Sequence, residues 1–129
     1  MIAQQLIKKY NLAADSYYTK SPYNKKYFFE KAEEGLKIEL SEDKLFSKWE
    51  SRIPDGWYGF SIGFPAPLVW YKAIDEFLDY VKLQNPDFQV LRIKTKYGSI
   101  RIYLNNVSES IQKEVDQLEA VLSDKYLIW

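Results

Sequence analysis

Four basic residues and a tyrosine lie close together in one short stretch of the chain. They are Arg92, Lys94, Lys96, Arg101 and Tyr103. The surrounding residues 88–106 contain no acidic residue. Guanidinium and ammonium groups bind phosphate oxygens, and an aromatic ring offers a surface on which a base can stack. This combination predicts a binding site for an anionic ligand such as a nucleotide or a nucleic-acid phosphate.

A β-hairpin is the element expected to position these side chains. Residues 88–96 and 99–104 alternate between apolar and polar types, and Tyr97-Gly98 lies between them. A two-residue loop gathers the apolar residues on one face, whereas a three-residue loop would place Ile93 opposite Arg101. The two-residue register predicts these cross-strand pairs: Leu91 with Leu104, Arg92 with Tyr103, Ile93 with Ile102, Lys94 with Arg101 and Thr95 with Ile100.

Lys94 and Arg101 then face each other as like charges, which destabilises a sheet. We expect compensation from an acid on another element or from an anionic ligand, and a cation–π contact between Arg92 and Tyr103. The alternative is a solvated sheet face whose charges are balanced by flanking acids. Residues 107–129 contain two basic and five acidic residues, and residues 51–87 contain three basic and five acidic residues.

The stretch 54–67 is a second candidate for binding. It contains three of the five glycines and three of the five prolines, interleaved with rings that include Trp57 and Tyr58. This composition predicts a turn-rich loop. Exposed rings make good binding anchors, so Trp57 and Tyr58 join the predicted ligand-binding residues. The alternative is a loop that fills the core between two helices.

Catalysis is constrained by the absence of histidine and cysteine from the sequence. A catalytic thiol, a Ser-His-Asp triad and a Cys/His metal site are excluded. The carboxylate pairs Asp75/Asp79 and Glu114/Asp116 accompany no recognisable metal or nucleophile motif, and acids on helices are mostly solvated. We therefore expect a non-enzymatic protein with no metal and no cofactor. A carboxylate-dependent enzyme is the less favoured alternative.

The remaining elements are expected to be mostly helical. Apolar spacing, caps and breakers predict helices at residues 2–14, 22–34, 42–51, 68–84 and 108–123, with a short strand at 36–40. The chain of 129 residues is expected to form one domain, residues 1–129. We predict an α+β fold, in which a small antiparallel sheet is centred on the 88–104 hairpin. The helices at 68–84 and 108–123 would pack on its apolar face.

Composition also bears on location and partners. Lysine plus arginine and aspartate plus glutamate each number 18, so the net charge is zero and duplex DNA binding is disfavoured. No apolar run approaches 18 residues, and the N-terminus lacks the pattern of a signal peptide. These features and the lack of cysteine predict a cytoplasmic protein without a membrane contact. The apolar end, residues 126–129, is expected to pack on the body or on a second copy as a homodimer.

Two motifs carry a resemblance that covers residues 45–104. Asp55-Gly56-Trp57-Tyr58 and the hairpin from Ile93 to Tyr103 occur in the order seen in a group of small uncharacterised phage and prophage proteins. Members of that group have a Gly-Asp-Gly-Trp-Phe/Tyr stretch and a hairpin similar to VKEKFGGLRFY. This chain departs from the pattern by inserting residues 60–67 and by lacking a later cysteine pair. The resemblance implies a phage-like origin and a common fold, and no activity.

Two functional hypotheses follow from the sequence. The first is a phage-encoded accessory or anti-defence inhibitor that binds a host effector or sequesters a nucleotide signal through the basic hairpin. The second is a protein–protein module, such as a toxin-immunity protein or a small adaptor, with the acidic helices or the aromatic tail as its interface.

Overall fold

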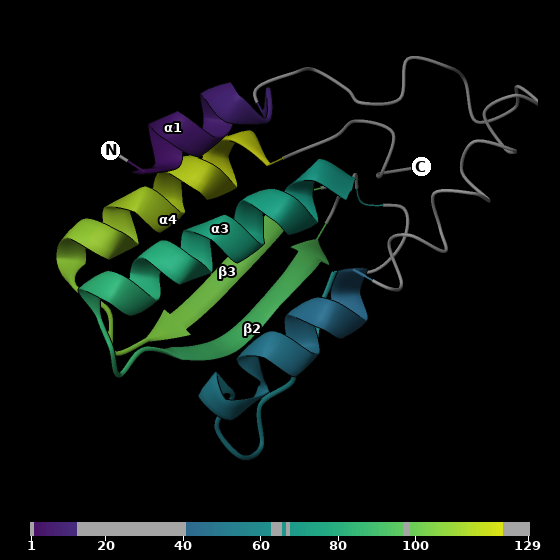
Figure 1. Ribbon diagram of the computed structural model, residues 1–129, viewed down its shortest axis with the longest axis vertical. Helices are drawn as coiled ribbons and strands as arrows, with labels where there is room; N and C mark the ends of the chain where they lie inside the picture. Colours follow the sequence, from purple (N-terminus) through teal and green to yellow (C-terminus); the bar gives the residue numbers. More distant parts are fainter. Residues whose placement is uncertain (1, 13–40, 63–65, 67, 97–98, 123–129) are drawn as a thin grey trace, which may run out of the picture.

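A computed structural model describes residues 2–12, 41–62, 66, 68–96 and 99–122 of the chain (Figure 1). The described elements form an α+β fold. In chain order they are α1 (Ile2–Lys9), a helix over residues 41–49, the 3-10 helix η1 (Glu50–Arg52), β1 (Gly59–Ser61), α3 (Leu68–Gln84), β2 (Gln89–Lys96), β3 (Ser99–Asn105) and α4 (Glu109–Val121). None of the described helices is long and apolar enough to cross a membrane.

The sheet has three strands in the order β1-β2-β3. β2 and β3 form the predicted antiparallel hairpin, whereas β1 pairs with β2 in parallel. The predicted α+β fold with a small sheet centred on the hairpin is confirmed, but the sheet is mixed rather than antiparallel, and residues 59–61 of the predicted loop form a strand. A strand of three residues is too short for its alternation to show in the sequence. Pairing with β2, rather than a local pattern, gives β1 its structure.

The hairpin register is confirmed from Arg92 to Lys96, where Ile93 pairs with Ile102 and Lys94 with Arg101. A β-bulge between Val90 and Arg92 then shifts the register by one residue. Val90 is fully buried and pairs with Leu104, so the predicted pairing of Leu91 with Leu104 is wrong. A bulge adds one residue to a strand, so the side chains on the far side of the bulge exchange their core-facing and outward-facing positions.

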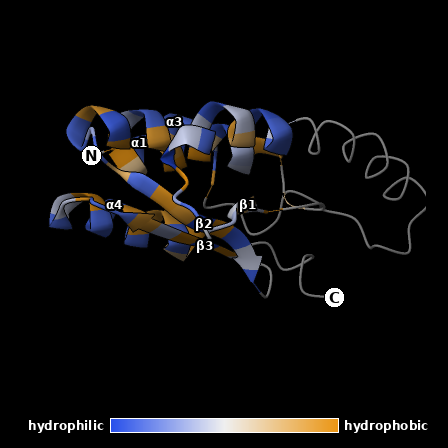
Figure 2. Ribbon diagram, turned by 90° about the horizontal axis from the view of Figure 1, so that it is seen from below, coloured by the Kyte–Doolittle hydropathy of each residue, from blue (hydrophilic) through white to orange (hydrophobic). Residues whose placement is uncertain are grey.

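Helix α3 forms a layer over the apolar face of the sheet (Figure 2). Its bounds agree with the predicted helix at 68–84. The apolar stripe of this helix is buried: Trp70, Ile74, Phe77, Leu78 and Val81. Burial of one large apolar side chain stabilises a fold by about 1.5–3 kcal/mol, so this stripe holds the helix on the sheet.

Helix α4 runs along the outer edge of β3 (Figure 1). Ser108 is the N-cap of this helix, since its hydroxyl accepts a hydrogen bond from Ile111 N at 3.3 Å. The Ile100 N–H donates to Leu122 O at 3.0 Å, and the Ile102 N–H donates to a Glu119 carboxylate oxygen at 2.9 Å. These bonds occupy edge donors of β3, so α4 protects that edge as well as contributing to the core.

The N-terminal helix lies against α3 and α4 (Figure 1). It ends at Lys9 rather than at residue 14, because Asn11 takes a left-handed φ of 52°. The helix predicted at 42–51 is confirmed as α-helix over 41–49, followed by η1. The predicted helix at 22–34, strand at 36–40 and packing of residues 126–129 lie outside the described residues.

Candidate anion-binding face

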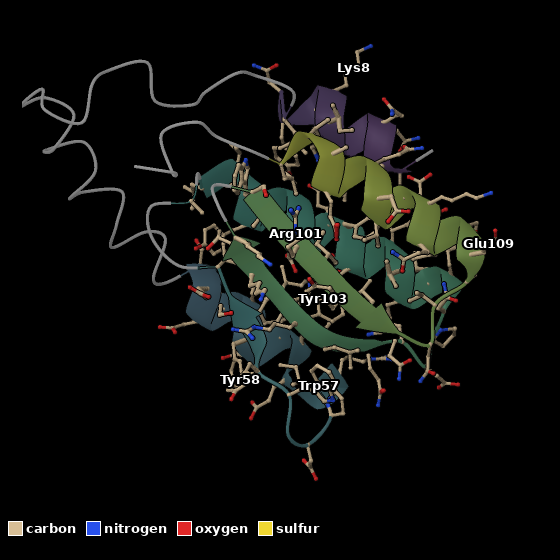
Figure 3. All side chains as sticks on the ribbon, turned by 180° about the vertical axis from the view of Figure 1, so that it is seen from behind. Lys8, Trp57, Tyr58, Arg101, Tyr103 and Glu109 are labelled. Carbon is tan, nitrogen blue, oxygen red and sulfur yellow. The ribbon has the colours of Figure 1, made fainter. Side chains whose placement is uncertain are left out.

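The face of the sheet opposite α3 carries the predicted basic residues (Figure 3). We call it the basic face and define it by one residue of β1, three of β2 and two of β3: Ser61, Arg92, Lys94, Lys96, Arg101 and Tyr103. Each alternates along its strand with a residue that faces the core, as the strand period requires. The structure therefore brings together all five hairpin residues that the sequence predicted as ligand-binding.

One row across the basic face combines a guanidinium group with aromatic rings. Arg92 pairs with Gly59 on β1 and with Tyr103 on β3. The Arg92 guanidinium carbon lies 5.1 Å from the centroid of the Tyr58 ring, and Arg92 Nε donates to Ser61 Oγ at 3.4 Å. The predicted cation–π partner, Tyr103, is thus corrected to Tyr58. Tyr58 lies beside Arg92 because the adjoining strand β1 pairs in parallel with β2.

The next row contains Ser61, Lys94 and Arg101 in register. Directly opposed residues have Cβ atoms about 5 Å apart, so the two positive charges repel each other across the strands. Within the described ranges, no acid forms an ion pair with Arg92, Lys94 or Arg101. The expected compensation by helix acids is therefore not found in the described part of the chain.

The aromatic segment splits between surface and core. Trp57 is 50% exposed and Tyr58 is 71% exposed, whereas Phe60 and Ile62 are buried. Gly56, with a φ of +88°, lies in the turn that precedes the two exposed rings. Figure 3 shows both rings on the same side of the molecule as Arg101 and Tyr103. The segment thus exposes two rings, as a binding loop requires, and buries Phe60 in the core, while binding by the exposed rings stays a prediction.

The position of β1 depends on contacts at its end. Ile62 N donates to a Glu42 carboxylate oxygen at 2.8 Å, which links β1 to the 41–49 helix. Thr95 Oγ1 donates to Ile62 O at 3.0 Å, which links β1 to β2. These two bonds hold Ser61 beside Lys94. Sequence reasoning missed this arrangement because its two hydrogen bonds join residues that are 20 and 33 positions apart in the chain.

The carboxylates considered for catalysis have structural partners. Lys48 Nζ lies 3.0 Å from Asp75 and 2.9 Å from Asp79, and Asp75 also accepts a bond from Trp49 Nε1 at 3.0 Å. Glu114 is buried and accepts a bond from Ala3 N at 2.6 Å. In the described ranges, no group of three acidic side chains is placed to hold a metal ion.

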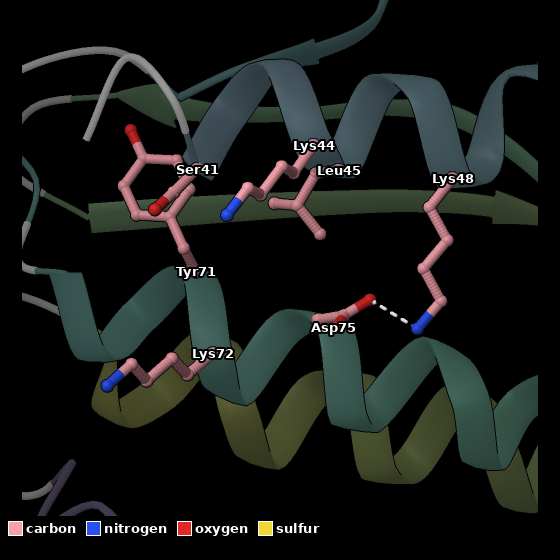
Figure 4. Close-up of a pocket in the computed structure, with 7 residues that line it drawn as sticks. All are labelled: Ser41, Lys44, Leu45, Lys48, Tyr71, Lys72 and Asp75. Atoms are coloured by element: carbon pink, nitrogen blue, oxygen red, sulfur yellow. Dashed lines mark ion pairs between the residues drawn. The ribbon is translucent and has the colours of Figure 1, made fainter. Parts of the chain in front are cut away.

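A cavity of about 350 Å³ lies between the 41–49 helix and α3 (Figure 4). Its lining residues are Ser41, Lys44, Leu45, Lys48, Tyr71, Lys72 and Asp75. The Lys48–Asp75 ion pair crosses the space between the two helices, and burial raises the pKa of the Tyr71 hydroxyl. The sequence offered no signal for this cavity, because its lysines belong to the polar sides of two helices distant in sequence.

Comparisons with protein-family models, with curated proteins and with solved structures found no match. The resemblance to phage and prophage proteins therefore stays a prediction.

Proposed function

We propose that the protein is a non-enzymatic binding protein that holds a nucleotide on its basic face. Lys94 and Arg101 would bind the phosphate, and Tyr58 or Tyr103 would stack on the base. The observation that carries the proposal is the opposed Lys94–Arg101 pair, which has no acidic partner among the described residues. An anionic ligand supplies the charge that this pair lacks.

The spacing of the two rows supports a nucleotide in particular. Same-face residues on one strand are about 7 Å apart, so Tyr103 lies that far along β3 from Arg101. A sugar joins the base of a nucleotide to its phosphate over a comparable length. A base on the Tyr103 ring would thus leave its phosphate beside the two opposed cations.

A thermal-shift screen of nucleotides tests this proposal, followed by calorimetric titration of any nucleotide that raises the melting temperature. A ligand at 100 times its Kd stabilises a fold by about 2.7 kcal/mol. The decisive variant is Lys94→Glu with Arg101→Glu, which reverses the charge of the face. Its matched control is Lys82→Glu with Lys113→Glu, two exposed lysines on α3 and α4.

We expect the basic-face variant to lose nucleotide binding and the control variant to keep it. The affinity of the wild-type protein should also fall as salt rises, because the contact is electrostatic. Equal loss in both variants would show that overall charge, rather than this face, governs binding. No stabilisation by any nucleotide would reject the proposal.

A protein partner is the second candidate, favoured by the exposure of Trp57 and Tyr58. Tryptophan, tyrosine and arginine dominate binding hot spots between proteins. An acidic protein surface would then meet the basic face, as in an inhibitor of a host effector, an immunity protein or an adaptor. In either case we propose a phage-encoded protein that acts in the host cytoplasm, which rests on the sequence resemblance.

A further inference from the structure

We infer that the ligand of the basic face contains at least two bases joined by a phosphodiester, so that the site takes an oligonucleotide rather than a single nucleotide. This inference rests on the proposed function and names its ligand class. It follows from the placement of two exposed tyrosine rings, one directly before β1 and the other on β3, with cations between them.

The two rings are too far apart to share one base. Tyr58 directly precedes β1 and Tyr103 lies on β3, with β2 between these strands. Neighbouring strands are about 4.8 Å apart, so the outer strands are separated by about 10 Å. Arg92 occupies the middle of this row, and its guanidinium group packs on the Tyr58 ring. A mononucleotide would therefore use one ring and leave the other in water.

The cations are placed where a linking phosphate would lie. Lys94 of β2 and Arg101 of β3 occupy the row next to Arg92 and Tyr103. Two bases stacked on Tyr58 and Tyr103 would span β2. The phosphodiester between them would pass over Arg92, beside Lys94 and Arg101 in the next row. Aromatic platforms combined with cations along the backbone are the usual means of binding single strands.

The shape of the basic face also favours an extended ligand. Sites for single small molecules are concave and surround most of the ligand. The cavity of Figure 4 lies between two helices, and no residue of the basic face lines it. The basic face is one side of a sheet, on which Tyr58 is 71% and Tyr103 46% exposed. On such an open surface, a longer ligand makes more contacts than a single nucleotide does.

Trp57 provides an intrinsic probe for the test. It is half-exposed beside Tyr58, whereas Trp49 and Trp70 are buried, so ligand binding on this face should change the Trp57 fluorescence. The probes are thymidine monophosphate, the linear thymidine dinucleotide, an oligothymidylate and a cyclic dinucleotide. A linear strand and a cyclic dinucleotide both contain two bases joined by a phosphodiester. Comparing the oligothymidylate with the cyclic dinucleotide therefore shows which of the two the face prefers. The Trp57→Phe variant should lose the fluorescence change, and calorimetry then measures whether it still binds the ligand. Together the two measurements show that the signal comes from Trp57.

The variants are Tyr58→Ala and Tyr103→Ala, each compared with its Tyr→Phe counterpart, which keeps the ring. Phe46→Ala removes an exposed ring from the 41–49 helix and serves as the control. Loss of one stacking ring weakens single-strand binding by about 5- to 150-fold. We expect each alanine variant to weaken dinucleotide binding within that range, while the phenylalanine and Phe46 variants bind nearly as the wild type does. Thermal melts establish that each variant is folded.

We expect the dinucleotide to bind at least about tenfold more tightly than the monophosphate, since it adds a second stacked base. Equal affinity for the two would overturn this inference but leave the proposed function standing. An alanine effect at one tyrosine alone would also overturn it. No binding of any of the probes would overturn both this inference and the proposed function.

Discussion

Lys94 lies directly opposite Arg101 across β2 and β3, in a register that places the Cβ atoms of these two positively charged residues about 5 Å apart. The described part of the chain supplies no carboxylate to either residue. The pair therefore disfavours the strand pairing that holds it in place. Sites of this kind commonly reduce the stability of a fold, because their residues serve a ligand that is absent from the free protein.

The single variant Arg101→Glu should therefore make the protein more stable while removing the proposed nucleotide binding. It replaces a repulsive cross-strand pair by an attractive one, which we expect to raise the free energy of unfolding by about 1 kcal/mol. Urea denaturation measures the change, and the gain should shrink at high salt. Lys113→Glu on α4 is the control. A loss of stability in Arg101→Glu would show that the opposed cations do not strain the hairpin.

The hairpin shows how far sequence patterning reaches. Apolar and polar residues alternate from Arg92 to Lys96, and only a two-residue loop keeps the apolar residues of both strands on one face. The register, and the gathering of the basic residues on the other face, were therefore predictable. The bulge was not, because Val90 and Leu91 are both apolar and either one fits the core. That Val90 is the buried residue is seen only in the structure.

The role of Tyr58 shows where sequence reasoning ends. Tyr58 reaches Arg92 through parallel pairing of a three-residue strand with a strand thirty residues away. No local pattern encodes such a contact, since it depends on how the whole core packs. The residue types of Trp57 and Tyr58 made them candidate binding residues, but their place beside the hairpin was not predictable.

Of the two described glycines of the 54–67 segment, Gly59 should tolerate substitution less. Its φ is +69°, and an added Cβ would lie 2.3 Å from Ile53 Cδ1, so Ile53 would have to move. Gly59→Ala should lower the free energy of unfolding by about 2 kcal/mol. Gly56 is the matched control, because its φ is +88° but nothing lies within 4 Å of an added Cβ.

Gly56→Ala should therefore lower the free energy of unfolding by only about 1 kcal/mol, which is the backbone cost alone. Chemical denaturation of both variants measures the difference. We also expect Gly59→Ala to weaken ligand binding, since Tyr58 directly precedes this residue. Equal destabilisation by the two substitutions would mean that the contact with Ile53 is relieved without cost.

Glu114 should secure the first turn of α1. Its carboxylate is buried and accepts a hydrogen bond from the Ala3 N–H at 2.6 Å, which links α4 to the start of the chain. Glu114→Ala leaves that buried donor unpaired, at a cost of about 1–3 kcal/mol. Glu114→Gln keeps an acceptor oxygen and should lose less. Hydrogen exchange of the α1 amides measures the effect, and unchanged protection in the alanine variant would contradict this role.

Glu76 should make the stability of the protein depend on pH in the acid range. Hydrogen bonds from Lys9, at 2.7 Å, and from Tyr10 lower the pKa of the Glu76 carboxyl below its usual value of 4.5. A carboxyl whose pKa is lower in the folded state stabilises the fold fully above the unfolded-state pKa. This contribution is lost as the pH falls through the folded-state pKa.

Comparison of the wild type with Glu76→Gln by urea denaturation measures this dependence. The advantage of the wild type should be constant above pH 4.5, the usual pKa of the carboxyl, and should decline at lower pH. Lys9→Met should reduce the decline because it removes the largest cause of the lowered pKa. Lys8→Met is its matched control, since Lys8 is the exposed neighbouring lysine of α1. A decline that persists in Glu76→Gln would assign the acid sensitivity to another carboxyl.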